Sequence, residues 1–291
     1  MDPQSALLFG LVGIVLPFML SLLATGAVWW RASGIEPGFA QPRHRLRRLA
    51  SATLAPALIL LLVQSLMLGV PTFPPREAMH RLPFLLLAGL LFGAIELAWM
   101  SPSWKSTLIG AMVLAAAAGI ASLASAWLVL AVVIAAGAWI ILRQIAWRET
   151  TPTILIPLGL YAAGTAAVLV ATGNLKLAQL AAACAMSLLA ILAVALARPK
   201  LTLAGPALTV TLAWLGALLG QGMTYGDTPK TAGLLWGIGG PIVICVMHHL
   251  LRKRAFARGW IAPALGAIAV LVLAVAIAML SRGEPLPAYG G

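Results

Sequence analysis

The sequence predicts an all-α fold: a polytopic integral membrane helix bundle of about ten transmembrane helices, with both termini on the non-cytoplasmic side. The chain of 291 residues is 62% hydrophobic and 9% charged, whereas soluble domains are about 25% charged. Its apolar residues form long uninterrupted stretches, which favours helices over a β-barrel, because a helix satisfies its backbone hydrogen bonds internally in lipid. A third observation, the uneven distribution of Lys and Arg between the stretches, predicts the orientation.

The apolar stretches place the helices in order. Crossing a hydrocarbon core of about 30 Å takes about 20 residues. We expect helices at 6–30, 49–70, 83–100, 105–121, 125–143, 153–171, 177–197, 204–220, 231–250 and 260–280.

The turn between the fourth and fifth helices is the least distinct boundary. Residues 108–143 form one apolar stretch broken only by the sequence Ala-Ser-Leu-Ala-Ser at 121–125. A single helix of this length would extend about 54 Å at a rise of about 1.5 Å per residue, too long for one crossing. We therefore expect a helical hairpin here, with nine helices as the alternative.

The basic residues predict which gaps face the cytoplasm. Fourteen of the 19 Lys and Arg lie in odd-numbered gaps, and five lie in the even-numbered gaps and the tail. Since cytoplasmic loops collect Lys and Arg, the odd gaps are predicted to be cytoplasmic. The net charge of +12 is thus expected to contact anionic lipid headgroups and not nucleic acid. The headgroup contacts come from two clusters: Arg43, Arg45, Arg47 and Arg48 in the first gap, and Arg252, Lys253, Arg254 and Arg258 in the ninth.

The chain is predicted to form one transmembrane domain over residues 1–291. Ten helices divide into halves at 1–145 and 146–291. Five helices per half would make the halves run in opposite senses, as in the inverted repeats of secondary transporters. The halves show no clear residue-level repeat, so the helix count permits this plan without establishing it.

Few polar residues fall within the predicted helices. Glu96 is the carboxylate expected at membrane depth, where a charge is costly and usually faces protein or water. It is a candidate proton or cation site, with a structural partner role or a wet position at the inner interface as alternatives. His248 and His249 lie near the cytoplasmic end of the ninth helix, and we hypothesise that His248 approaches Glu96 as a titratable pair or a satisfied polar pair. Gln64 and Tyr161 are expected to form interhelical hydrogen bonds.

The ninth helix contains a candidate break. Gly237, Gly239, Gly240 and Pro241 fall within five residues, and such interruptions occur in the broken helices of transporters. The alternative is a continuous helix with a proline kink and close packing at the glycines. Gly216 and Gly220 predict a second close approach on the eighth helix, and the segment 221–230 is expected to be a connecting loop.

The sequence contains no recognisable catalytic, metal or nucleotide-binding motif. The two cysteines, Cys184 and Cys245, fall at different predicted depths, so neither a disulfide nor a thiolate metal site is expected. No cofactor is predicted.

Three functions remain open at this stage. The first is a transporter or permease for a small or lipophilic solute, and the second is a non-catalytic scaffold or accessory subunit of a larger membrane complex. The third is an intramembrane enzyme that modifies lipid, for which the arginine clusters would hold a phosphate headgroup. An enzyme is the least favoured, and a homo-oligomer remains open. The Arg-, Ala- and Gly-rich composition suggests a GC-rich bacterium, so we expect a multi-pass protein of the bacterial inner membrane.

Overall fold

The computed structural model describes residues 10–30, 55–69, 82–84, 86–87, 142, 151–197, 205–251 and 261–281. Within these ranges the chain is helical apart from the short turns between helices, and no strand occurs among them. The elements are η1 (Leu11–Val15), α2 (Leu16–Trp30), α4 (Ala55–Leu68), α8 (Thr151–Ala171), α9 (Leu175–Ala197), α10 (Gly205–Tyr225), α11 (Lys230–Leu251) and α12 (Ile261–Leu280).

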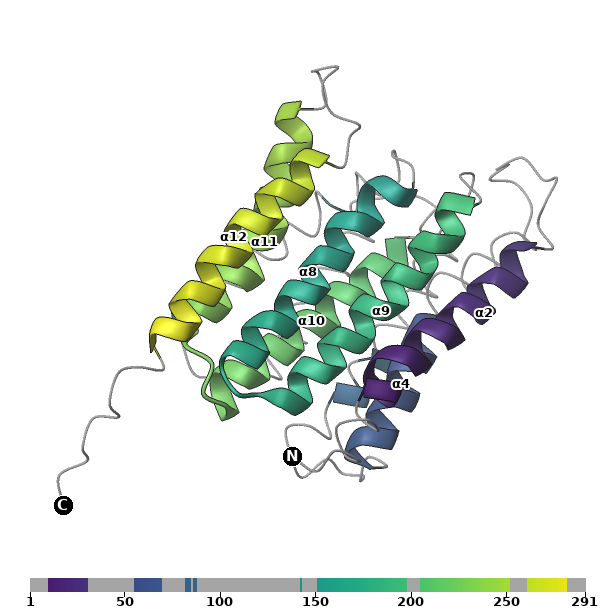
Figure 1. Ribbon diagram of the computed structural model, residues 1–291, viewed down its shortest axis with the longest axis horizontal. Coiled ribbons are helices and arrows are strands. Elements are labelled where there is room, and N and C mark those ends of the chain that lie inside the picture. The colour runs from purple at the N-terminus through teal and green to yellow at the C-terminus, as the bar shows by residue number, and fades with distance from the viewer. Residues whose placement is uncertain are drawn as a thin grey trace.

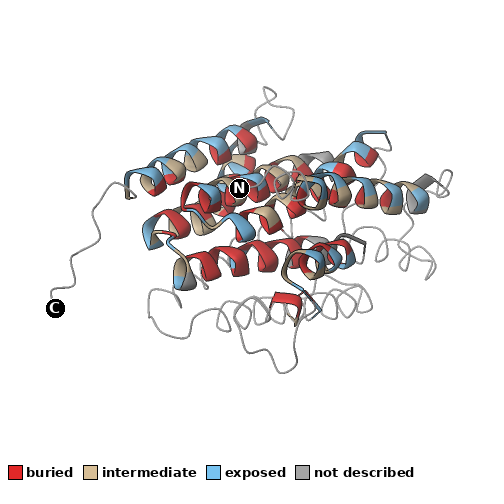
Figure 2. Ribbon diagram, turned by 60° about the horizontal axis from the view of Figure 1, so that its bottom comes forward, coloured by how far each residue is buried: buried red, intermediate tan, exposed pale blue. Residues whose placement is uncertain are grey.

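Helix α9 lies at the centre of the described bundle. It packs against η1, α2, α4, α8 and α10, while α8 also contacts α11 and α12. Helices α11 and α12 form an antiparallel pair at one side, and α2 and α4 lie at the other side (Figure 1). The buried residues line the helix faces that look toward one another, and exposed residues cover the outer faces (Figure 2).

Three described helices are long and apolar enough to cross a membrane by length and composition. They comprise Ile154–Ala171, Leu175–Ala197 and Lys230–Leu250. Shorter apolar helices occur at Leu11–Ala27, Ala57–Leu68 and Ala264–Leu280. The exposed faces of these helices carry large apolar side chains such as Leu196, Leu265 and Val272, which suits a lipid environment.

The first described helix begins with a wider turn for a local reason. Residues Leu11–Val15 are π-helical, and Pro17 follows within the next turn. A proline ring clashes with the carbonyl four residues before it, here that of Gly13, and a π-turn relieves such crowding. Gly13 is also the buried residue of this segment and packs against the side chain of Gln179 on α9.

Glycine ends α8 and reverses the chain. Gly173 has a φ of 84°, a left-handed conformation that favours glycine. The amide of Asn174 donates to the carbonyl of Leu169, and the amide of Gly173 donates to that of Val170, each at 2.9 Å. This pair of bonds is a Schellman motif, and it lets α9 start at Leu175 beside α8.

The start of the first described helix and the end of the last one lie at the same end of the bundle. We name it the turn end, since it holds the α8–α9 turn (172–174) and the α10–α11 turn (226–229); the opposite end is the far end. Gly13 in η1 contacts Gln179, which is close to the start of α9. Ala278 in the last turns of α12 clusters with Ala171 and Ala232. Thus η1 starts at the turn end, and α12 finishes there.

Seven of the predicted helices have counterparts among the described residues, with most ends within a few residues of the expected ones. The predicted helices at 83–100, 105–121 and 125–143 lie almost wholly outside the described residues, as does the boundary at 121–125. One boundary was wrong: the segment expected as a loop at 221–230 is helical as far as Tyr225. Gly216 was also expected in a close approach, but it is exposed with no neighbour within 4 Å.

Candidate functional site

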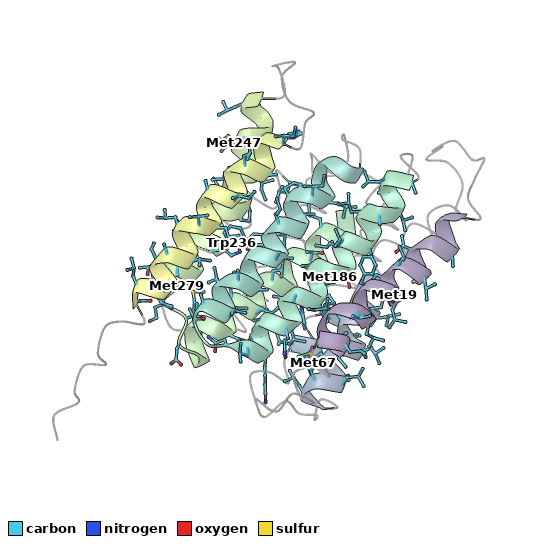
Figure 3. All side chains as sticks on the ribbon, in the orientation of Figure 1. Met19, Met67, Met186, Trp236, Met247 and Met279 are labelled. Atoms are coloured by element: carbon cyan, nitrogen blue, oxygen red, sulfur yellow. The ribbon has the colours of Figure 1, made fainter. Side chains whose placement is uncertain are left out.

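In the interior of the described bundle, α8 is joined to α11 by a stacked aromatic pair with its own hydrogen bonds. The rings of Tyr161 and Trp236 stack with centroids 5.4 Å apart and planes inclined by 29°. Both side chains are buried, with 2% and 0% of their surface exposed. Figure 3 places Trp236 between the α11–α12 pair and α8.

Hydrogen bonds run in both directions across this contact. The indole N–H of Trp236 donates to Oγ1 of Thr165 at 3.0 Å. The Thr165 hydroxyl donates in turn to the carbonyl of Tyr161 at 2.9 Å. The Tyr161 hydroxyl donates back to the carbonyl of Gly237 at 3.0 Å. All the polar atoms of the two rings are therefore satisfied by the facing helix, as buried polar groups require.

Two glycines make room for the rings. A Cβ on Gly164 would overlap the six-membered part of the Trp236 ring, and a Cβ on Gly240 would lie 2.9 Å from Cδ2 of Tyr161. Each helix thus presents a glycine where the other helix inserts an aromatic ring. Small residues allow such close approach between helices in lipid.

Pro241 explains why Tyr161 binds where it does. A proline inside a helix has no amide to donate to the carbonyl four residues earlier, which here is that of Gly237. An unsatisfied carbonyl in a hydrocarbon environment costs several kcal/mol. The Tyr161 hydroxyl supplies the missing donor from α8. Helix α11 consequently runs without interruption from Lys230 to Leu251, through Gly237, Gly239, Gly240 and Pro241.

The continuous helix corresponds to the second of the two alternatives for this segment, close packing around a proline. Gly240 meets Tyr161, and a Cβ on Gly239 would lie 3.3 Å from Cγ1 of Val270 on α12. The interruption of the helix expected in the first alternative does not occur in α11. The expected interhelical hydrogen bond of Tyr161 is confirmed.

Only some of the polar residues singled out in the sequence lie within the described ranges. His248 lies in the last turns of α11 and is 8% exposed, while His249 beside it is exposed. Gln64 is buried in α4 with 3% of its surface exposed. Glu96 lies outside the described residues, so its expected approach to His248 stays a prediction. The two basic clusters, Arg43, Arg45, Arg47 and Arg48, and Arg252, Lys253, Arg254 and Arg258, also lie outside them.

Sequence reasoning missed a set of buried polar groups in the middle of the bundle. The hydroxyls of Ser21 and Thr25 on α2 and of Ser187 on α9 are buried with no hydrogen-bond partner in the described part of the chain, as is the indole N–H of Trp214 on α10. Ser21 and Thr25 are four residues apart and therefore share a face of α2. This i, i+4 spacing was the available signal, although single Ser and Thr residues are too common in membrane helices to be conspicuous.

Three of these groups lie at a similar depth. Gly13 contacts Gln179, and Ser21 and Ser187 each lie eight residues further along helices that both leave the turn end. Gly226 lies against Asn174, and Trp214 is twelve residues back from Gly226. At a rise of about 1.5 Å per residue, Ser21, Ser187 and Trp214 fall near the same level, about 18 Å from the α8–α9 turn.

A second polar cluster ties the two turns at the turn end. The hydroxyls of Thr172 and Thr228 are 2.9 Å apart, and the side-chain amide of Asn174 donates to both, at 3.2 and 2.9 Å. A Cβ on Gly226 would overlap the Asn174 side chain. Since Thr172 and Asn174 belong to the α8–α9 turn and Thr228 to the α10–α11 turn, this cluster fixes the two hairpins to each other.

Ionisable groups are sparse in this part of the protein. Among the described residues the one carboxylate is Asp227, which is exposed in the α10–α11 turn. No group of three or more His, Cys, Asp or Glu residues that could hold a metal ion occurs within the described ranges. Cys184 and Cys245 are both buried, and they form no disulfide with each other.

The chain matches no family model, and no curated protein matches it.

Proposed function

We propose that the protein is a transporter or permease of a bacterial inner membrane, built from about ten transmembrane helices. We propose that it carries a small, uncharged or lipophilic solute across that membrane. The observation that carries this proposal is a set of buried polar atoms without a partner among the described residues: the hydroxyls of Ser21 and Ser187 and the Trp214 indole N–H at one level, and the Thr25 hydroxyl one turn further along α2. Leaving a buried donor unsatisfied costs about 1–3 kcal/mol, and a solute with hydrogen-bonding groups would offset this cost.

The character of these groups supports the solute class. They are hydroxyls and one indole N–H, and no carboxylate, Lys or Arg lies within the described helices between the two ends of the bundle. A charged solute would need an opposite charge or several convergent donors in a low-dielectric site. Neutral groups that can donate or accept one bond each suit a solute that is itself mostly apolar.

The proposal is tested by transport in proteoliposomes. We would measure the uptake of a panel of radiolabelled neutral solutes of graded hydrophobicity, and the flipping of a fluorescently labelled phospholipid, against protein-free vesicles. We expect protein-dependent flux of at least one neutral member and a drop of several-fold in Ser187→Ala. The matched control is Ser281→Ala, because the Ser281 hydroxyl already donates to the carbonyl of Ala278 in its own helix.

If the protein produced no flux of any solute in the panel, the proposal would be wrong. If the purified protein then retained a stoichiometric membrane partner, the alternative of an accessory subunit or scaffold would replace it. Release of a phosphate or headgroup from the labelled lipid would instead support a lipid-modifying enzyme. Anionic lipid is proposed to bind the two basic clusters in any of these cases.

A further inference from the structure

The hydrogen bond from Tyr161 is placed at the turn of α11 where Pro241 has removed the helix's own bond. Around that turn, Gly237, Gly239 and Gly240 add backbone freedom and leave no side chains to brace the helix. Proline and glycine together are the usual cause of a bend in a helix. At this turn, therefore, the shape of α11 depends on a bond from another helix.

We propose that the segment Gly237–Pro241 is a hinge in α11, and that the Tyr161 hydroxyl is the latch that holds it in the position seen here. The hinge divides α11 into two arms. The turn-end arm comprises residues 230–236, and the far-end arm comprises residues 242–251. This inference goes beyond the proposed transport function, since it holds for α11 whatever the protein carries.

The turn-end arm is fixed to α8 at several points. Thr228, just before the arm, bonds to Thr172 at the end of α8. Ala232 packs with Ala171, and Trp236 bonds to Thr165 and inserts against Gly164. These contacts extend from the turn to the hinge, so this arm is held against α8 along its length.

The far-end arm is attached to a different partner. Gly266 on α12 lies against Val243 and Met247, so the two helices are in close contact beyond the hinge. The contacts just given are with α12, which itself also packs against α8, and Ile244 and Cys245 of this arm are buried in the main core. A change of angle at the hinge would therefore move the far-end arm together with the start of α12, and would carry His248 with it.

The strength of the latch suits a reversible device. A hydrogen bond between membrane helices contributes on average about 0.6 kcal/mol and at most about 1.7, and a tenfold population change corresponds to about 1.4 kcal/mol. Removing the bond is thus expected to raise a minor bent population about threefold, and at most about twentyfold. The change is large enough to detect and small enough for a bound solute or a neighbouring helix to reverse.

The test uses pulsed electron–electron double resonance in lipid nanodiscs, which measures distances between pairs of spin labels and so reports a change in the angle of α11. Spin labels are placed on Leu196→Cys and Leu250→Cys, two exposed far-end positions on α9 and α11, in a background of Cys184→Ala and Cys245→Ala. A second label pair at exposed Lys176→Cys and Thr231→Cys reports the turn end. Each pair is examined with and without Tyr161→Phe.

The matched control is Thr165→Val, which also removes one hydrogen bond between α8 and α11 but lies on the turn-end side of the hinge. We expect Tyr161→Phe to enlarge a second far-end distance population by about threefold to twentyfold, with the turn-end distances unchanged. Thr165→Val should leave the far-end distribution as it is. Adding Pro241→Ala to Tyr161→Phe should abolish the second population, because the restored amide donates to Gly237.

Three results would overturn the hinge: an unchanged far-end distribution in Tyr161→Phe, an equal change in Thr165→Val, or a second population that survives Pro241→Ala. Should Tyr161→Phe fail to fold, Pro241→Ala alone decides the matter. In the otherwise unchanged protein it is expected to narrow the far-end distribution, and an equal or broader distribution would contradict the proposal.

Discussion

At the scale of single residues, the contact between α8 and α11 depends on what is missing as much as on what is present. Gly164 has no Cβ where the Trp236 ring lies, and Pro241 has no amide where the Tyr161 hydroxyl binds. The sequence shows each of these residues plainly. It does not show which aromatic ring meets which glycine, because Gly164 and Trp236 lie on different helices, and their meeting depends on the register of packing.

Gly164 gives a sharp test of this close approach. Gly164→Ala is expected to lower the free energy of unfolding by about 1–3 kcal/mol, because the new methyl group overlaps the Trp236 ring within a packed core. The measurement is unfolding in mild detergent followed by circular dichroism. The control, Gly159→Ala on the same helix, has no neighbour within 4 Å and is expected to be neutral or to gain about 0.5–1 kcal/mol. Equal stability of the two variants would contradict the packing described here.

At the scale of helices, the apolar pattern predicts the elements well and their terminations less well. Helix α9 was expected at 177–197 and occupies Leu175–Ala197, since it has a continuous apolar stretch bounded by polar residues. Helix α10 was expected to end at residue 220, where glycine and glutamine begin, but it continues to Tyr225. Gly222 stays helical because its missing side chain admits Leu169 and Thr228. The end of a helix is thus set by tertiary contacts that local composition does not contain.

The candidate break in α11 illustrates the same limit. The local sequence identifies Gly237–Pro241 as the weak turn of the helix, but it does not show whether the helix is interrupted there. The decision depends on Tyr161, which is 76 positions away from Gly237 and supplies the missing donor. The sequence therefore predicts where the weak turn of α11 lies, but not which conformation the backbone adopts there. The buried hydroxyls of Ser21 and Ser187 were not predictable even as a place, since their significance depends on depth and on the absence of partners.

The contact between the two turns should behave as a coupled unit. Thr172→Val and Thr228→Val each remove one hydroxyl from the cluster, and each is expected to cost about 0.5–1.5 kcal/mol of unfolding free energy. Because the two hydroxyls contact each other, the double variant should differ from the sum of the single variants by at least about 0.5 kcal/mol in a double-mutant cycle.

The matched cycle for that experiment pairs Thr172→Val with Thr224→Val. The Thr224 hydroxyl donates to the carbonyl of Gly220 within its own helix, at 2.8 Å, and takes no part in the cluster. This second pair is expected to be additive within about 0.5 kcal/mol. Additivity in both cycles would mean that the turns are not joined as described.

At the scale of the whole molecule, the charge pattern makes a prediction about where the chain begins and ends. The positive-inside argument requires an even number of crossings, and such a chain begins and ends at the same face of the membrane. In the described bundle, η1 starts beside Gln179 and α12 finishes beside Ala171, both at the turn end. The charge argument also assigns the α8–α9 and α10–α11 turns to one side, and the Thr172–Thr228 contact places them together.

Which side of the membrane the turn end occupies is open to direct measurement. The charge pattern predicts that it faces outward, because the described Lys and Arg residues at this end are Lys176 and Lys230 alone, at the starts of α9 and α11, while the first and ninth gaps carry the arginine clusters. In the background of Cys184→Ala and Cys245→Ala, single cysteines are introduced at Lys176 and Asp227 for the turn end and at His249 for the far end. A further one is introduced at Arg45, in the first gap, which the charge pattern assigns to the cytoplasm. Intact cells are then treated with a membrane-impermeant maleimide.

Labelling is expected at the cysteines replacing Lys176 and Asp227, with protection at those replacing His249 and Arg45 until the cells are opened. The reverse pattern would keep the fold and invert its orientation, and the basic clusters would then face away from the anionic cytoplasmic leaflet. Labelling of Lys176→Cys with protection of Asp227→Cys would be more damaging, because the two turns are joined through Asn174 and Thr228. A bundle that places these turns on opposite faces could hold neither the turn-end cluster nor the fixed arm on which a hinge in α11 depends.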